Sequence, residues 1–184
     1  NFMDESYSDH VPLYATLTTQ TQVQNIAQKS INQIKKISNE RAKIVGIVLY
    51  RDKNGYILAD ESRRGIYIFE KNPSLPLGTR VEAVVNRVEN FKGNLEITSL
   101  SYINVDTKFA SNQSDYLLSL NELSSATSGD VIGDITLNIK NGFATIFGEK
   151  FKIYSPKKEL KDGEITVKKA IVWNYKGQKE LIIE

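Results

Sequence analysis

The chain has 184 residues and a formal net charge of +2, with 40% hydrophobic and 25% charged residues. These values are typical of one medium or two small globular domains, and they exclude a fibrous or wholly disordered chain. The sequence contains no cysteine, which excludes disulfides, thiolate metal sites and cysteine nucleophiles. No apolar run approaches the roughly 18 residues of a membrane-spanning helix.

The N-terminal 40 residues divide into a polar terminus and a predicted helix. Residues 1–20 carry three acidic side chains and no Lys or Arg, so we predict a flexible acidic segment. From about residue 21, apolar side chains recur at helical spacing, which predicts an amphipathic helix ending near residue 37. The apolar stripe of this helix needs a surface to cover.

Five strands are predicted after this helix, at residues 44–49, 56–59, 65–69, 81–88 and 95–103. Gly46 lies inside the first strand, where a glycine favours a sharp bend. Asn54-Gly55 supplies the positive-φ residues of a tight hairpin turn. The proline-rich loop at 70–79 is too short for a helix, so we expect the helix at 21–37 to close the end of the strand assembly instead.

The second half of the sequence repeats this order. Residues 106–115 form a polar predicted linker, and the capping-box spacing of Ser119 and Glu122 predicts a short helix. Five further strands are predicted at 131–139, 143–147, 150–154, 165–173 and 180–183. Glycines at positions 46, 55, 78 and 93 recur 84–87 residues later, at 133, 142, 163 and 177. This spacing indicates a duplicated β-rich unit.

Four motifs in the first unit carry a resemblance to a known fold: Val45-Gly-Ile-Val48, Gly55-Tyr-Ile-Leu-Ala-Asp60, Gly65-Ile-Tyr-Ile-Phe69 and Leu77-Gly-Thr-Arg-Val81. The unit resembles the OB fold, and in particular the tRNA-anticodon-binding-like modules found in exported bacterial proteins. The second unit matches less well because it lacks the Asp-turn-Gly signature. The resemblance implies a mainly β protein of two tandem five-stranded OB-fold (Greek-key) barrels, each preceded by a helix, with domains at 21–105 and 116–184.

OB modules of this class bind single-stranded nucleic acid on strands two and three, where aromatic rings stack on bases. In the first unit this position offers Arg63, Arg64 and Tyr67 as a secondary candidate site. However, strand 65–69 alternates aromatic residues with isoleucines, so both of its faces are apolar. A sheet that is apolar on both sides is usually covered on both sides. We therefore expect a helix or the other unit to cover this face.

The second unit carries the primary candidate site. Residues 140–184 contain ten lysines and six acidic residues, a net charge of +4. A wet, basic and partly aromatic face is predicted from Lys150, Lys152, Tyr154, Lys168 and Lys169. The alternative is a lysine-rich solvated surface that limits association at sheet edges.

Catalysis finds little support in the sequence. His10 is the single histidine, and the Asp60-Glu61 and Asp130/Asp134 pairs fit a turn and a strand entrance better than a calcium loop. We predict no catalytic residue, no metal ligand and no cofactor. Trp173 and Tyr175 are interpreted as core and rim residues, with an aromatic carbohydrate site as the alternative.

These observations together predict a non-catalytic tandem OB-fold binding or interaction module whose ligand the sequence does not identify, although a protein or glycan partner fits the covered first unit. Single-stranded nucleic acid bound by the second unit is the alternative function. The first residue is Asn1 rather than Met, which fits a trimmed or processed form. With the resemblance to modules of exported proteins, it suggests a secreted, periplasmic or cell-surface location.

Overall fold

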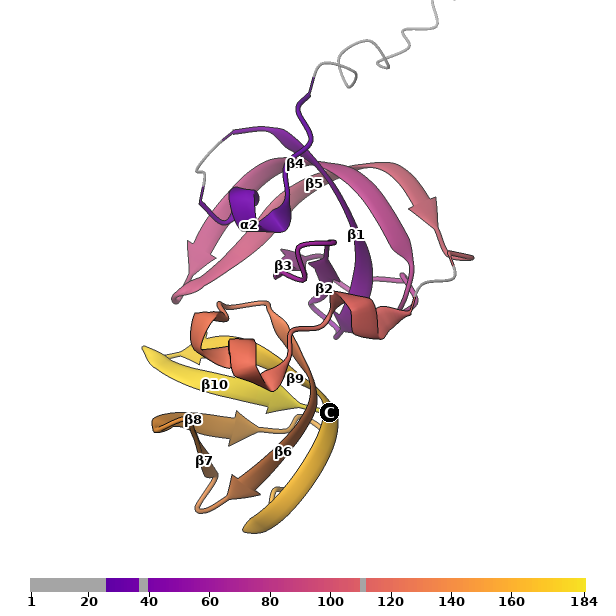
Figure 1. Cartoon of the computed structure of the whole chain (residues 1–184). Helices are drawn as coiled ribbons and strands as arrows, with labels where there is room; N and C mark the ends of the chain where they lie inside the picture. The colour runs from indigo at the N-terminus through magenta and orange to yellow at the C-terminus, as the bar shows by residue number, and fades with distance from the viewer. Residues whose placement is uncertain (1–25, 37–39, 110–111) are drawn as a thin grey trace, which may run out of the picture.

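The structure is a computed structural model that describes residues 26–36, 40–109 and 112–184. Within these ranges the chain forms two five-stranded sheets that follow one another along the sequence (Figure 1). The predicted acidic segment at 1–20 lies outside the described residues. No helix in the described part has the length and apolar character needed to cross a membrane.

The first sheet is a closed barrel in the order β1-β2-β3-β5-β4. Its strands are β1 (Ala42–Arg51), β2 (Gly55–Ala59), β3 (Gly65–Phe69), β4 (Arg80–Phe91) and β5 (Asn94–Asp106). The barrel closes because β4 pairs with β1, from Ala42 opposite Val85 to Ile47 opposite Arg80. Only β3 and β5 run parallel. This is the strand order of an OB barrel.

Gly46, where a bend is predicted, lies at a close approach of β1 to β2. A Cβ atom at this position would lie 2.6 Å from the carbonyl oxygen of Ala59, so β1 and β2 approach more closely than any side chain allows. Further along β1, the pairing register with β2 shifts between Val48 and Tyr50, which marks a bulge. The bent strand pairs with β4 along one half and with β2 along the other, and this closes the barrel.

The second sheet has the order β6-β9-β10-β8-β7. Its strands are β6 (Val131–Ile139), β7 (Phe143–Ile146), β8 (Glu149–Tyr154), β9 (Gly163–Tyr175) and β10 (Gln178–Ile183). The strands occupy the same relative positions as in the first barrel, which confirms the predicted pair of OB-type units. The second unit, however, is a half-barrel. Between β6 and β7 the structure has one isolated bridge, from Lys140, just after β6, to Phe143.

The predicted helix at 21–37 is reduced to α2 (Ile31–Ile34) in the described residues. Backbone pairing outcompetes the helix before it. The N–H of Lys43 donates to Ala27 O at 2.9 Å, and the N–H of Lys29 donates to Lys43 O at 2.9 Å. The side chain of Ser30 then caps the short helix in a capping box with Gln33. The helix prediction is therefore wrong for residues 26–30, while residues 21–25 and 37 lie outside the described ranges.

Short helical segments nevertheless close both sheets, as expected. Ile31 and Ile34 of α2 are fully buried in the core of the first barrel, and residues 70–79 contain no helix. In the second unit, the 3-10 helices η1 (Gln113–Tyr116) and η2 (Leu120–Ser125) precede β6. The capping box of Ser119 and Glu122 is present at the start of η2, and Leu123 packs into the second core.

Candidate ligand site between the barrels

The outer face of β1, β2 and β3 packs against the second half-barrel. Ile57, Ala59 and Tyr67 of this face share one buried apolar cluster with Val131 of β6 and Ile171 of β9. In Figure 1, β2 and β3 lie on the side of the first barrel that faces the second sheet. Of the two covers expected for this face, a helix or the other unit, the structure has the other unit. The cover is partial, however, and the uncovered part forms a pocket.

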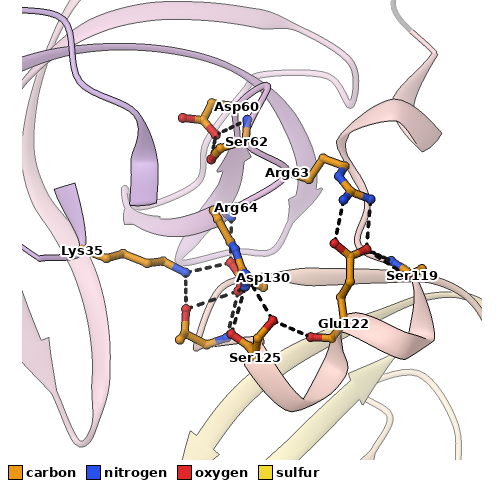
Figure 2. Close-up of polar contacts among 11 residues, drawn as sticks. Lys35, Asp60, Ser62, Arg63, Arg64, Ser119, Glu122, Ser125 and Asp130 are labelled. Atoms are coloured by element: carbon orange, nitrogen blue, oxygen red, sulfur yellow. Dashed lines mark hydrogen bonds and ion pairs between the residues drawn. The ribbon is translucent and has the colours of Figure 1, made fainter. Parts of the chain in front are cut away.

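A buried carboxylate joins the two units beside the apolar cluster. Asp130, just before β6, is fully buried and receives donors from both units (Figure 2). Its oxygens accept from Lys35 Nζ at 2.8 Å and from an Arg64 guanidinium N–H at 2.9 Å. They also accept from the backbone N–H groups of Gly65 at 2.9 Å and Thr127 at 2.8 Å. Burial lowers the pKa of Lys35, an effect that the Asp130 carboxylate opposes.

The two arginines of the secondary candidate site also serve this contact. Arg63 makes a bidentate pair with Glu122 of η2, with N···O distances of 2.6 and 3.0 Å. The Arg64 guanidinium donates to the carbonyl oxygen of Ser125 at 3.0 Å. The backbone N–H of Ser119 and the Arg63 guanidinium hold the pKa of Glu122 below its usual range. The structure therefore places both guanidinium groups against the second unit.

The backbones of the two units come close together at Gly65 and Gly129. A Cβ at Gly65 would lie 2.3 Å from the carbonyl oxygen of Gly129, and Gly129 has a φ of +88°. Neither position has room for a side chain.

The tip of the β4–β5 hairpin makes a second bridge to the other unit. Asn94 is 1% exposed, and its side-chain amide donates to Asn174 O at 2.9 Å. The side-chain oxygen of Asn94 accepts from the Asn174 N–H at 2.8 Å and from the Ser128 hydroxyl at 2.6 Å. These bonds fix the hairpin tip against β9.

Between this bridge and the apolar cluster lies a pocket of about 750 Å³, which we call the inter-barrel pocket. The outer face of the first barrel forms its floor, and β9 and β10 form the opposite wall. Aromatic side chains dominate the lining: Tyr50, Tyr67, Phe69, Phe91, Trp173 and Tyr175. Tyr67 and Trp173 meet edge to face, with ring centroids 5.4 Å apart. The two units thus share one aromatic site.

The floor of the pocket carries a row of neighbouring residues on three strands. Tyr67 of β3 pairs with Glu96 of β5, and Glu96 pairs directly with Glu89 of β4. Asp52, in the β1–β2 turn, also lines the pocket and accepts from the Tyr67 hydroxyl at 2.8 Å. Three carboxylates and a tyrosine therefore share the floor.

Burial and mutual repulsion shift the ionisation of this floor. Burial raises the pKa of Glu96, and the neighbouring Asp52 and Glu89 carboxylates raise it further. Burial together with the bond to Asp52 raises the pKa of Tyr67. Burial, followed by the charge of Asp52, raises the pKa of Tyr50 to about 12.

The structure divides the primary candidate site. Lys150, Lys152 and Tyr154 share the outer face of β8, where Tyr154 is 47% exposed. The Lys152 ammonium pairs with Glu180 at 3.1 Å and lies 4.5 Å from the ring centre of Tyr175. The Lys150 ammonium lies 4.1 Å from the ring centre of Phe143. This basic strip adjoins the rim of the inter-barrel pocket.

The two lysines of β9 do not join this strip, because β10 separates β9 from β8. Lys168 is solvent-exposed and pairs with Asp134 at 3.0 Å. Lys169 points instead to the first unit and donates to Leu49 O at 3.1 Å and to Gln113 Oε1 at 2.7 Å. Burial lowers the pKa of Lys169.

The sequence indicated only part of the pocket. Its single tryptophan, Trp173, was interpreted as a core or rim residue, and it lies on the pocket wall. The carboxylates of Glu89 and Glu96 gave no local signal, because their relation depends on the pairing of β4 with β5. The two-sided apolar pattern of β3 was the one sequence feature that pointed to this interface.

No family model and no curated protein matches the chain. Seven chains of solved structures do match. One, described as "Molecular basis for abrogation of activation of pro-inflammatory cytokines", is 12% identical with a TM-score of 0.35, over 79% of this chain and 89% of that chain.

Two others are each 13% identical with TM-scores of 0.32. "Crystal structure of Ifi202 HINa domain in complex with 20bp dsDNA" covers 79% of this chain and 92% of that one. "Structural mimicry for functional antagonism" covers 79% and 89%. Likeness at this level establishes neither fold nor function, so the fold assignment depends on strand order and register.

Proposed function

We propose that the chain is a non-catalytic binding module whose ligand occupies the inter-barrel pocket. The observation that carries this proposal is the position of the pocket on β2 and β3 of a closed OB barrel. The β1–β2 turn and the β4–β5 hairpin tip flank it, and OB folds bind their ligands between these elements. Its volume of about 750 Å³ lies within the usual range for ligand sites, about 300–1,000 Å³.

The chemistry of the lining supports the same proposal. Aromatic rings from both units line the pocket, and amide side chains of Asn54, Asn90 and Asn174 add polar groups. A largely apolar cavity with a few convergent polar groups is the usual form of a ligand site.

Trp173 provides the test, because it is the only tryptophan of the chain and lies on the pocket wall. Its fluorescence is followed while basic peptides, neutral oligosaccharides and single-stranded oligonucleotides are added. We expect at least one class to change the emission in a saturable manner. Phe91→Ala, at a 55% exposed position of the lining, weakens that binding, whereas Phe147→Ala, at a 67% exposed position outside the lining, leaves it unchanged. An emission that none of the three classes alters contradicts the proposal.

A second candidate is single-stranded nucleic acid on the basic strip of β8. The observation that favours it is the common exposed face of Lys150 and Tyr154, with Lys152 between them. Filter binding with single-stranded DNA and RNA over a salt series tests it. Binding that weakens as salt rises, and that Lys150→Ala reduces, supports this candidate. Absent or salt-independent binding excludes it.

The exported setting is a proposal that depends on the resemblance to modules of exported proteins. Detection of the native protein in culture medium or in the cell-surface fraction supports it, and confinement to the cytoplasmic fraction contradicts it. A screen with generic hydrolase substrates tests the non-catalytic assignment, and turnover of any of them would contradict it.

A further inference from the structure

The carboxylates on the pocket floor are arranged at a cost to stability. Glu89 and Glu96 lie directly opposite each other on β4 and β5, and like charges in such a cross-strand pair destabilise a sheet. Glu89 pairs with the Arg87 guanidinium at 2.6 Å, so Glu96 is the member of the pair without a counter-charge. Asp52 adds a third negative charge, and both neighbours raise the pKa of Glu96. A cation bound between these groups would remove the repulsion.

Among these three carboxylates, Glu96 has the fewest partners that could offset its negative charge. Its residue is 7% exposed, and among the residues that the structure describes no cation pairs with its carboxylate and no donor bonds to it. The hydroxyl oxygen of Thr98, two residues along the same strand, is also buried at the pocket without a partner in that part of the chain. Polar groups buried without partners are costly. The Glu96 carboxylate and the Thr98 hydroxyl therefore lack hydrogen-bond partners, which a bound ligand can supply.

The aromatic rings around the pocket already attract ammonium groups of this chain. Lys92 Nζ lies 5.0 Å from the ring centre of Phe91, and Lys176 Nζ lies 5.3 Å from that of Tyr175. Both lysines also line the pocket, at exposed positions of its rim. Ammonium groups bind to aromatic faces through the ring quadrupole. Tyr67 and Trp173, deeper in the pocket, offer the same kind of surface beside Glu96.

The carboxylates do not form a metal site. In the described ranges no group of three or more His, Cys, Asp or Glu side chains is placed to hold a metal ion. A volume of about 750 Å³ with six aromatic side chains in its lining also fits an organic group better than a hydrated inorganic ion.

We infer that the inter-barrel pocket takes an organic cation, an ammonium group carried on an apolar stem. The ammonium group binds the Glu96 carboxylate, with Glu89 and Asp52 beside it, and the stem lies against the rings of Tyr67 and Trp173. This inference depends on the proposed binding function of the same pocket. A basic peptide and a free polyamine share this chemistry, and the experiment separates these two sources.

The experiment titrates the whole chain with four probes while Trp173 fluorescence and calorimetric heat are recorded. The probes are an end-blocked pentalysine peptide, spermine, maltohexaose and a 15-nucleotide oligo-dT. We expect pentalysine or spermine to bind saturably at the pocket, and the tighter of the two identifies the source. Maltohexaose and oligo-dT are expected not to bind there.

Glu96→Gln keeps the shape of the side chain and removes its charge. We expect it to weaken cation binding about tenfold or more, because it removes one partner of a buried charge pair. Glu89→Gln is the second variant and weakens binding in the same direction. Glu164→Gln, at an exposed position of β9, is the matched control and leaves the affinity unchanged. Thermal unfolding of each variant verifies that it is folded.

The outcomes separate this inference from the proposed function. If maltohexaose or oligo-dT alters Trp173 emission while pentalysine and spermine do not bind, the organic-cation inference is overturned. The pocket then remains a binding site for another class of ligand. Cation affinity that is equal in Glu96→Gln and the wild type would also overturn it. If none of the four probes nor any member of the wider ligand panel affects Trp173, both proposals fail.

Discussion

Asp130 shows how one residue can hold two barrels together. Its carboxylate has no exposure to solvent, and Lys35, Arg64, Gly65 and Thr127 all donate to it. Removing one member of a buried ion pair leaves the other charges uncompensated, which is more damaging than the net value of the pair. Stability at this contact therefore depends on the charge of Asp130.

Asp130→Asn is expected to lower the free energy of unfolding by about 3 kcal/mol or more, because Lys35 and Arg64 lose their buried counter-charge. Chemical denaturation measures the change. Asp134→Asn is the matched control, since the exposed pair of Asp134 with Lys168 contributes about 0–1 kcal/mol. Equal effects of the two substitutions would contradict the role assigned to Asp130.

Glu96 predicts a pH dependence of stability with a defined sign. Its folded-state pKa is raised, so the native state binds the proton more tightly than the unfolded chain. Stability is then highest below the unfolded pKa of about 4.3 and falls as the pH rises through the raised folded-state pKa. We expect Glu96→Gln to remove this decline and to raise the melting temperature near pH 7. Melting curves of Glu96→Gln and of the control Glu164→Gln, measured from about pH 3, below the unfolded pKa of about 4.3, to about pH 8, test it. A variant that melts below the wild type at pH 7 would contradict it.

At the scale of elements, the long β4–β5 hairpin has two functions. Its strands close the first barrel, and its tip reaches β9 through Asn94 and forms one side of the pocket. The tip is held by side-chain bonds rather than by strand pairing with β9. Its order therefore depends on a few polar groups.

Asn94→Ala is expected to destabilise the chain by about 1–3 kcal/mol, because the backbone N–H and carbonyl of Asn174 lose their partners. Hydrogen exchange should become faster at the hairpin tip and at Asn174, and remain unchanged in the core of β1. Asn138→Ala, at an exposed position of β6, is the control. Unchanged exchange at the tip would show that the bridge is not what orders it.

At the scale of the whole molecule, the two units share an apolar cluster, a buried ion contact and the bridge at Asn94. The inner face of the second half-barrel is covered by its own core, while part of its outer face is buried only against the first barrel. Each unit thus supplies surface that the other needs.

Both units are expected to unfold in one transition. Trp173 fluorescence reports on the interface and far-UV circular dichroism reports on all strands, so the two melting curves should coincide. The calorimetric and van't Hoff enthalpies should also agree. Two separated transitions would show that the units are stable independently.

The sequence predicted the structural features that depend on residues close together along the chain. Strand positions and the outward face of Lys150 and Lys152 follow from short-range patterns, and the structure has them. The helix at 26–30 failed because pairing of Ala27 and Lys29 with Lys43 outcompeted helical periodicity. The row of Tyr67, Glu96 and Glu89 was not predictable, since strand register alone brings it together. The same holds for Asp130, whose donors come from both units.

The contact of Gly65 with Gly129 has a consequence for the choice of ligand. Main-chain atoms lie close together there, so the backbone sets the separation of floor and wall, and a side chain introduced at either glycine would force the two units apart. Adaptation to ligands of different bulk is then left to Lys92 and Lys176, whose long side chains lie at exposed positions of the mouth. The backbone at this crossing therefore sets the width of the cavity, and the two lysines set the shape of its entrance.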